Sequence, residues 1–241
     1  MASASFSHFS TFRGPEKIPN SKTLISSSRS PSYPLLVSSP LTHLRSHHHH
    51  QISRSLSASV STQQQISDDL VSSILSKVTD TDRGVLLTKD EHAEVAEVAQ
   101  QLANYCVDEP VKCPLIFGEW DVLYCSVPTS PGGGFRSAFG RLVFKTKEMV
   151  QAVEAPETVR NQVSFSLFGF LDGDVSLKGK LIVLDDKWIQ VIFEPPQLKV
   201  GSLEFQFGGK SEVKLEITYI DEKIRLGKGS RGSLFVFKRR G

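Results

Sequence analysis

The sequence predicts a mainly β fold: an antiparallel barrel or sandwich that follows two short α-helices and a disordered N-terminal segment. Three observations lead to this prediction. From Phe117 onward, apolar and polar residues alternate with period two, as they do in strands with two different faces. Turn-forming residues recur in this region roughly every 8–15 residues. Before it, apolar residues follow helical spacing, and residues 1–65 show neither pattern.

Residues 1–65 have the composition of an organelle transit peptide. They contain 18 Ser and 6 Lys+Arg but a single acid, and Ser-rich, acid-poor segments of this kind are typical of import signals. The Met-Ala start and the scarcity of early Arg favour plastids over mitochondria. The longest apolar run, Tyr33–Val37, is too short for a secretory signal. We therefore expect residues 1–60 to be a disordered chloroplast transit peptide cleaved between residues 54 and 65. A Ser-rich tail without a targeting role is the alternative.

The composition of the remaining chain excludes several classes of protein. Residues 66–241 hold 25 acids and 22 bases, a net charge of −3, which argues against a nucleic-acid-binding domain. Three Cys are too few for a disulfide scaffold, and no run of about 18 apolar residues predicts a transmembrane helix. One His, His92, lies beyond residue 65. We expect it on an exposed helix surface, and we expect no catalytic residues, no cofactor and no metal site.

Two helices are expected in a helical lead over residues 66–110. In the first, Ile66–Val78, the apolar residues fall on one helix face. A turn follows at Asp80–Gly84. The second helix, Lys89–Tyr105, is preceded by Thr88-Lys-Asp-Glu91, which has the spacing of a capping box.

About eight to ten strands are expected between Trp120 and Phe237. Asp172-Gly173 separates two apolar runs, Ser164–Leu171 and Val175–Leu184, and is expected to form a hairpin turn. A later strand has four apolar residues that alternate with polar ones and should share one face. These residues are Val213, Leu215, Ile217 and Tyr219.

One segment, Phe165–Phe170, is apolar at alternate positions on both of its faces. A strand with two apolar faces needs cover on both sides. In a barrel, one face can look into a cavity while helices cover the other. Such an apolar cavity would bind a hydrophobic small molecule. A solidly packed core without a cavity is the alternative.

Two motifs in this region resemble those of a known family. The first opens the strand region at Leu115-Ile-Phe-Gly-Glu-Trp-Asp-Val-Leu-Tyr124, and the second runs from Tyr219 to Val236. In both, and across residues 66–241, the chain is similar to the plastid-lipid-associated proteins, or plastid fibrillins. The motif residues that become candidates for ligand contact or structure are Gly118, Trp120, Tyr124, Asp221, Arg225, Gly227, Arg231 and Gly232.

The resemblance implies a lipocalin-like β-barrel over residues 115–240. It also implies a non-enzymatic protein that binds or shields a lipophilic molecule of the lipid, prenylquinone or carotenoid class. The partner would be that molecule or a membrane lipid surface, contacted peripherally at the thylakoids or plastoglobules of chloroplasts. A structural coat or scaffold of plastid lipid bodies, without an internal ligand, is the alternative. Cys125 departs from the family pattern, which often has Thr after the Tyr.

Roles for the candidate residues follow from their chemistry. Tyr124 or Asp221 could orient the polar end of a ligand. Arg225 and Arg231 could pair with Asp221 or meet an anionic head group, and internal pairing is the favoured interpretation. Gly227-Lys-Gly-Ser-Arg-Gly232 matches G-x-G-x-x-G, but a nucleotide site requires that motif to open a helix within a βαβ unit. We expect these glycines to allow a tight, twisted turn instead.

Overall fold

The computed structural model describes residues 51–127 and 144–241, with side chains from residue 62 onward. The chain divides into two units, Met1–Ser55 and Leu56–Gly241, and the second contains all of the described strands. The predicted transit peptide lies outside the described residues as far as residue 50.

Two α-helices and one 3-10 turn precede the strands, as expected. They are α1 (Gln51–Val78), α2 (Lys89–Ala103) and η1 (Pro114–Ile116). Helix α1 begins at Gln51 rather than at the predicted Ile66, because no Pro or Gly in the intervening Ser- and Gln-rich stretch interrupts it.

The start of α2 confirms the predicted capping box. The Thr88 hydroxyl accepts a hydrogen bond from the Glu91 amide at 3.3 Å, and the Glu91 carboxylate accepts one from the Thr88 amide at 2.7 Å. The predicted turn between the helices is also present. Asp80, Asp82 and Arg83 adopt positive φ angles there, and so does Gly84 with a φ of 91°.

Ten strands follow within the described residues, in agreement with the expected number. They are β1 (Gly118–Cys125), β2 (Phe144–Glu154), β3 (Thr158–Leu167), β4 (Leu171–Val183), β5 (Trp188–Phe193), β6 (Gln197–Val200), β7 (Leu203–Gln206), β8 (Ser211–Ile220), β9 (Ile224–Gly229) and β10 (Leu234–Arg239).

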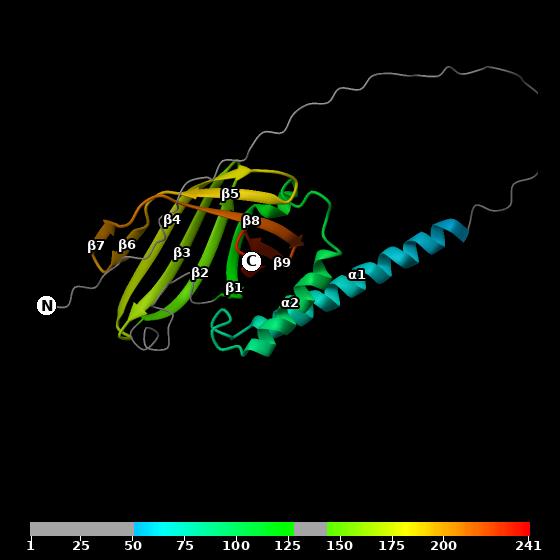
Figure 1. Ribbon diagram of the computed structural model, residues 1–241, viewed down its shortest axis with the longest axis horizontal. Helices are drawn as coiled ribbons and strands as arrows, with labels where there is room; N and C mark the ends of the chain where they lie inside the picture. Colours follow the sequence, from blue (N-terminus) through cyan, green and yellow to red (C-terminus); the bar gives the residue numbers. More distant parts are fainter. Residues whose placement is uncertain (1–50, 128–143) are drawn as a thin grey trace, which may run out of the picture. The chain divides into compact units, whose positions relative to one another are not determined.

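Eight of these strands form a closed antiparallel barrel. The sheet order is β3-β2-β1-β10-β9-β8-β5-β4, and β4 pairs again with β3, so the sheet has no free edge in this part. The β6–β7 hairpin extends from the first half of β4 (Figure 1). The structure therefore confirms a barrel rather than a sandwich.

The hairpin between β3 and β4 turns three residues earlier than predicted. Its loop is Phe168–Phe170, and the predicted turn residues Asp172 and Gly173 are paired inside β4 with Ser166 and Phe165. Positive φ angles fall at Phe168 and at the next residue, which is a glycine. Gly173 is needed for close packing, since a Cβ there would lie 2.6 Å from the Phe165 ring.

This earlier turn also corrects the expectation of a strand with two apolar faces. Strand β3 ends at Leu167, so Phe168 and Phe170 belong to the loop. Their side chains are 66% and 81% exposed, whereas Phe165 is buried inside the barrel. The apolar residues of this segment are thus divided between the core and the tip of a hairpin.

The wall of the barrel separates two apolar clusters. The inner cluster lies inside the barrel and includes Trp120, Val153, Val191 and Phe237. The outer cluster joins the barrel wall to one side of α1 and α2, which lie next to β1 and β9 (Figure 1). Its members from the helices are Val71, Ile74, Val78, Val95, Val98, Ala99 and Leu102.

Strand β8 changes face partway along its length, which the sequence pattern did not predict. Leu215 and Ile217 belong to the inner cluster, but Tyr219 belongs to the outer cluster. A shift in the β8–β9 register between Ile217 and Tyr219 causes this change. The fourth residue of the predicted face, Val213, is 44% exposed near the start of the strand.

The contact between the helices and the barrel should supply a large part of the stability. Leu102 of α2 is fully buried in the outer cluster, whereas Leu86 is 61% exposed. We expect Leu102→Ala to lower the free energy of unfolding by about 2–5 kcal/mol, as measured by urea denaturation. Leu86→Ala is the matched control and should change it by less than about 0.5 kcal/mol. Equal effects of the two substitutions would contradict this packing.

Candidate functional site

Trp120 forms the floor of the barrel at the end that the segment before β1 covers. It is fully buried, and its indole N–H donates to the Ile116 carbonyl at 3.2 Å. Ile116 itself belongs to the inner cluster. The guanidinium of Arg239 lies 4.2 Å from the centre of the indole ring and donates to the carbonyls of Leu115 and Phe117.

The glycine of the first motif is required by this floor. Gly118 has a φ of 130°, and a Cβ there would lie 2.5 Å from Nη1 of Arg239. A larger residue would therefore displace the guanidinium from Trp120. The motif residues Gly118 and Trp120 thus have a structural role at this end of the barrel.

Arg225 lies inside the barrel, beside Trp120. It is fully buried, and its guanidinium lies 4.8 Å from the Trp120 ring centre and 4.3 Å from that of Phe237. Its Nη2 donates to the side-chain oxygen of Gln151, a residue of β2. The favoured interpretation, an internal ion pair between Arg225 and Asp221, is wrong because the two side chains have other partners.

No carboxylate compensates the charge of Arg225 within the described part of the chain. Its only ionic neighbour there is a second cation, Arg239. Burial, and then the nearby Arg239, lower the pKa of Arg225 to about 9. Its two aromatic contacts are worth about 0.5–2 kcal/mol each, against a burial penalty of several kcal/mol for an ion.

The polar groups of this site are also incompletely bonded. Among the described residues, Nε and Nη1 of Arg225 and Nε of Arg239 are buried without a hydrogen-bond partner. Gln151 is held in place from its other end, because its amide nitrogen donates to Asn161 at 3.0 Å. The covered end of the barrel is therefore rich in donors and poor in acceptors.

Tyr124 lies on the outer side of the barrel wall and not in its interior. Its hydroxyl is 2.6 Å from Nδ1 of His92, and its ring is fully buried in the outer cluster. Burial raises the pKa of Tyr124 to about 12. His92 is therefore partly buried and bonded to the barrel, which corrects the expectation of an exposed surface His. Tyr124 does not face an internal ligand.

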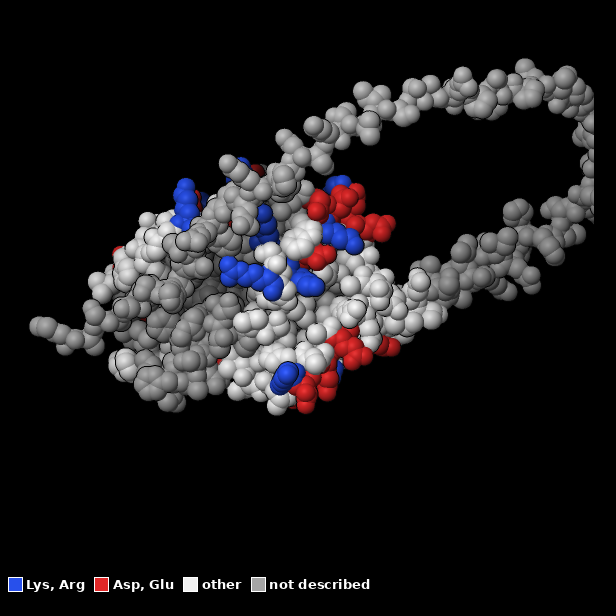
Figure 2. Space-filling model, viewed as in Figure 1, with Lys and Arg blue, Asp and Glu red and all other residues white. Residues whose placement is uncertain are grey.

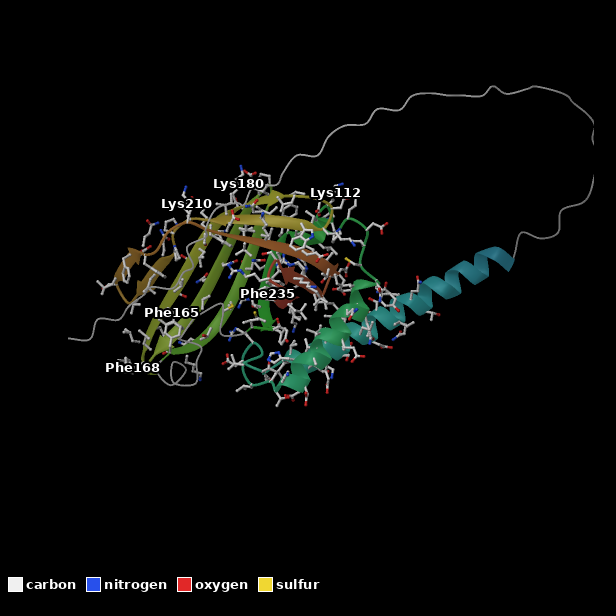
Figure 3. All side chains as sticks on the ribbon, in the orientation of Figure 1. Lys112, Phe165, Phe168, Lys180, Lys210 and Phe235 are labelled. Atoms are coloured by element: carbon white, nitrogen blue, oxygen red, sulfur yellow. The ribbon has the colours of Figure 1, made fainter. Side chains whose placement is uncertain are left out.

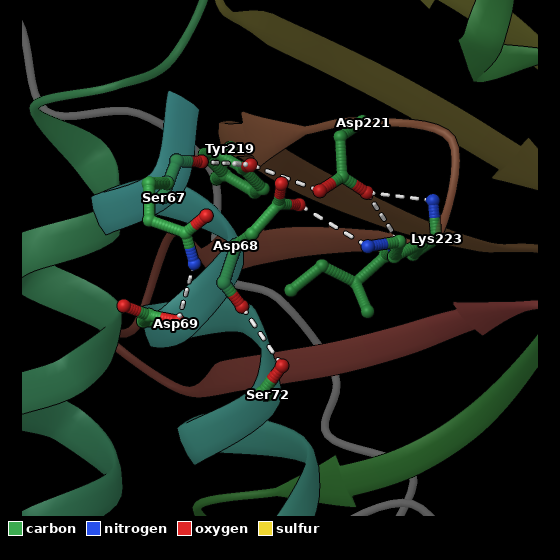
Figure 4. A network of polar contacts seen from close by, with 9 residues as sticks. Ser67, Asp68, Asp69, Ser72, Tyr219, Asp221 and Lys223 are labelled. Atoms are coloured by element: carbon green, nitrogen blue, oxygen red, sulfur yellow. Dashed lines mark hydrogen bonds and ion pairs between the residues drawn. The ribbon is translucent and has the colours of Figure 1, made fainter. Parts of the chain in front are cut away.

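Asp221 anchors the β8–β9 turn to helix α1, as Figure 4 shows. Its carboxylate accepts from the Tyr219 hydroxyl at 2.9 Å and from the Lys223 amide at 2.7 Å. The Tyr219 hydroxyl is 2.8 Å from that of Ser67, and Nζ of Lys223 is 3.1 Å from the Asp68 carboxylate. Asp221 therefore also lies outside the barrel interior.

The glycines of the second motif build a strand and its turn. Gly227 faces the barrel interior, where a Cβ would lie 2.9 Å from the Leu215 side chain. Gly232 has a φ of 84° in the β9–β10 turn, and its amide donates to the Gly229 carbonyl at 2.8 Å. Gly232 lies in the tight turn expected from these glycines, whereas Gly227 lies in strand β9. Arg231 is exposed in the turn.

At the opposite end, the apolar inner face of the barrel continues onto the β6–β7 hairpin. Gly173 pairs with Val200 and Val200 with Leu203, and directly paired residues share a face of a sheet. The inward face of β4 therefore extends across both strands of the hairpin. Leu203 and Phe205 on this face are 68% and 51% exposed.

The tip of the β3–β4 hairpin adds further apolar surface at this end. Phe168 and Phe170 stack with ring centres 6.3 Å apart, and Phe168 lies at the end of the sheet away from the helices (Figure 3). We refer to Phe168, Phe170, Leu203 and Phe205 together as the apolar rim. Exposed apolar groups of this extent often mark interaction sites.

Charged side chains of both signs are mixed on the described outer surface that Figure 2 shows. On the face shown in Figure 2, basic and acidic side chains of the described residues lie close together. A cleft of about 650 Å³ on the outer side of β2, β3 and β4 is lined by charges of both signs, among them Glu148, Arg160 and Lys178. This mixture does not select one class of ligand.

Residues 51–127 and 144–241 contain no group of three or more His, Cys, Asp or Glu side chains that could hold a metal ion. No helix in the described part of the chain is long and apolar enough to span a membrane.

Comparison with known proteins supports the family suggested by the motifs. The family model named PAP_fibrillin matches residues 68–209 and 202–238. The curated protein "Probable plastid-lipid-associated protein 8, chloroplastic" from Arabidopsis thaliana is 60% identical over 221 residues, which cover 91% of this chain and 92% of the relative. No solved structure gives a significant match.

The buried Tyr124 predicts a specific loss of stability at high pH. Its pKa is raised from an ordinary value of about 10 to about 12, so above pH 10 the unfolded chain releases a proton that the folded chain retains. The contribution of Tyr124 to the free energy of unfolding is therefore complete below pH 10 and falls as the pH rises toward 12. The difference between wild type and Tyr124→Phe, measured by urea denaturation, should narrow over this interval. Parallel pH profiles would contradict the prediction.

Proposed function

We propose that this chain, which belongs to the PAP_fibrillin family of plastid-lipid-associated proteins, holds a lipophilic small molecule in its barrel at a plastid lipid surface. The observation that carries the proposal is the continuity between the apolar interior and the exposed rim. The molecule would be of the lipid, prenylquinone or carotenoid class, and the role would be binding or shielding rather than catalysis.

The apolar rim gives a lipophilic molecule a route between a lipid phase and the barrel. Removing apolar surface from water contributes about 25 cal/mol per Å², so contact between the rim and lipid is favourable. Because Leu203 and Phe205 share a face with the inner side of β4, a molecule on the rim meets no polar barrier along this face. Barrels of about eight strands are either filled by their own side chains or hold one small ligand.

Attachment to the lipid surface would be apolar rather than electrostatic. Residues 66–241 have a net charge of −3, which gives no general attraction to anionic lipids. Aromatic side chains such as Phe168 and Phe170 instead bury apolar area at the boundary between water and lipid. Location in the chloroplast follows from the transit-peptide composition and from the word "chloroplastic" in the name of the relative.

A structural coat of plastid lipid bodies is the second candidate, and a different observation favours it. Side chains fill the space beside two glycines that face inward. The Phe165 ring packs against Gly173, and Leu215 packs against Gly227. A barrel filled by its own side chains would contact lipid only through the rim and other outer surfaces.

Identifying the lipids that the chain binds distinguishes a ligand-binding barrel from a structural coat. The full chain would be incubated with a total plastid lipid extract and re-isolated, and its bound lipids would be identified by mass spectrometry. We expect one lipid class to be enriched at close to one molecule per chain. An unfolded sample of the chain is the control for non-specific adsorption. No enrichment over this control, with the fold verified by circular dichroism, would leave the coat as the better account.

The rim itself can be tested on vesicles of plastid galactolipids. The double substitution Phe170→Ser with Leu203→Ser should weaken binding at least about tenfold, because it removes two exposed apolar side chains from contact with lipid. Flotation at 0.5 M NaCl would measure binding while salt screens the basic N-terminal segment. Leu86→Ser removes an equally exposed Leu elsewhere and should leave binding unchanged. Equal losses in both variants would argue against a role for the rim.

A further inference from the structure

We infer that Arg225 is the head-group site of the barrel, where its guanidinium binds an anionic oxygen of a single-chain amphiphile. That oxygen belongs to a carboxylate or a phosphate monoester, and the apolar tail extends toward the rim. This inference rests on the proposed binding of a lipophilic molecule inside the barrel and specifies its chemical class.

The bonding of Arg225 is the first reason. The side chain is fully buried, and it makes one described hydrogen bond, from Nη2 to Gln151. Its Nε and Nη1 have no partner within the described residues. Buried donors in proteins are bonded in the great majority of cases. Two unbonded donors on one buried side chain therefore indicate an acceptor supplied from outside the chain.

The lack of a negative charge to balance Arg225 is the second reason to infer an anionic ligand. No described carboxylate pairs with Arg225, and the neighbouring Arg239 adds a second positive group with an unbonded Nε. Both guanidinium groups contact the ring of Trp120. A neutral acceptor or a water molecule would satisfy the donors but leave two buried cations uncompensated. An anion satisfies the donors and also balances the charge.

The site is also held in a fixed orientation. Gln151 donates to Asn161 at 3.0 Å, so its oxygen is directed toward Arg225. The Trp120 and Phe237 rings contact the guanidinium. An Arg that is positioned before the ligand arrives loses little conformational freedom when it binds.

The inward residues of β3 and β4 between Arg225 and the apolar rim are mostly apolar, as contact with an apolar tail requires. Inward positions on β3 run from Asn161 through Val163 to Phe165, about 13 Å along the strand at roughly 3.3 Å per residue. Their partners on β4 are Leu177, Val175 and Gly173. Beyond Gly173 the same face continues to the rim. Polarity therefore decreases from the covered end to the open end, as it does from head to tail in an amphiphile.

Three probes with the same chain and different heads test the inference. Oleate carries a carboxylate, oleyl phosphate a phosphate monoester, and methyl oleate no charge. Their affinities for the full chain would be measured by isothermal titration calorimetry. We expect at least one anionic probe to bind at least about tenfold more tightly than methyl oleate, and the stronger of the two anions identifies the head group.

Substitution of Arg225 should remove this preference. In Arg225→Gln, the affinity for the preferred anion should fall at least about tenfold, to the level of methyl oleate. The affinity for methyl oleate should stay within about twofold of wild type. Arg160→Gln removes an exposed guanidinium from the outer face and serves as the control, with all three affinities unchanged.

If Arg225→Gln does not fold, a measurement on the wild-type protein alone tests whether Arg225 contacts the head group. Carbon-13 NMR of carboxyl-labelled oleate reports the pKa of the bound carboxyl. Contact with a buried guanidinium should hold that pKa below about 4.3, whereas an apolar site without a cation should raise it.

The two possible failures can be told apart. Equal binding of oleate, oleyl phosphate and methyl oleate by wild type, or a raised carboxyl pKa, would overturn the role of Arg225 and leave the proposed lipophile binding intact. Binding of no probe, together with no lipid captured from the plastid extract, would overturn the proposed function itself.

Discussion

The pairing of β3 with β4 closes the sheet on itself, and the rest of the structure depends on this closure. An open sheet would expose the inward residues of all eight strands. The closed sheet instead places them in one interior, covered at one end by the segment that carries Ile116. Closure also explains the two apolar clusters, since successive residues of a strand point to opposite sides of the wall. The helices then cover one side of the barrel while its interior keeps its own core.

The same alternation places polar groups with different roles on opposite sides of the barrel wall. Tyr124 and Tyr219 point outward, where His92 and Ser67 bond them to the helical part of the chain. Arg225 points inward, where the described residues offer no acceptor to its Nε and Nη1. The hydroxyls of Tyr124 and Tyr219 are therefore hydrogen-bonded within the chain and fasten its parts together. The guanidinium of Arg225 keeps two donors unbonded among the described residues, as a group that binds a ligand would.

Local patterns predicted much of the fold because they depend on neighbouring residues. The capping box at Thr88, the shared face of Leu215 and Ile217 in β8, and the turn at Gly232 all follow from short stretches of sequence. Register depends on pairing between distant strands, so the position of Arg225 could not be derived. The turn at Phe168 and the change of face before Tyr219 were missed for the same reason. Phe235, Phe237 and Arg239 are at alternate positions, and this spacing could have placed Arg239 on the same strand face as the two Phe residues. In the sequence, however, Arg239 looks like part of a basic C-terminal cluster, between Lys238 and Arg240.

A crystal structure of the full chain grown with oleate tests the central claim most directly. The account predicts continuous electron density inside the barrel, with the carboxylate within hydrogen-bond distance of Nε or Nη1 of Arg225 and the chain directed toward Leu203 and Phe205. An interior occupied only by side chains and water, with oleate absent or bound on the outer surface, would contradict it.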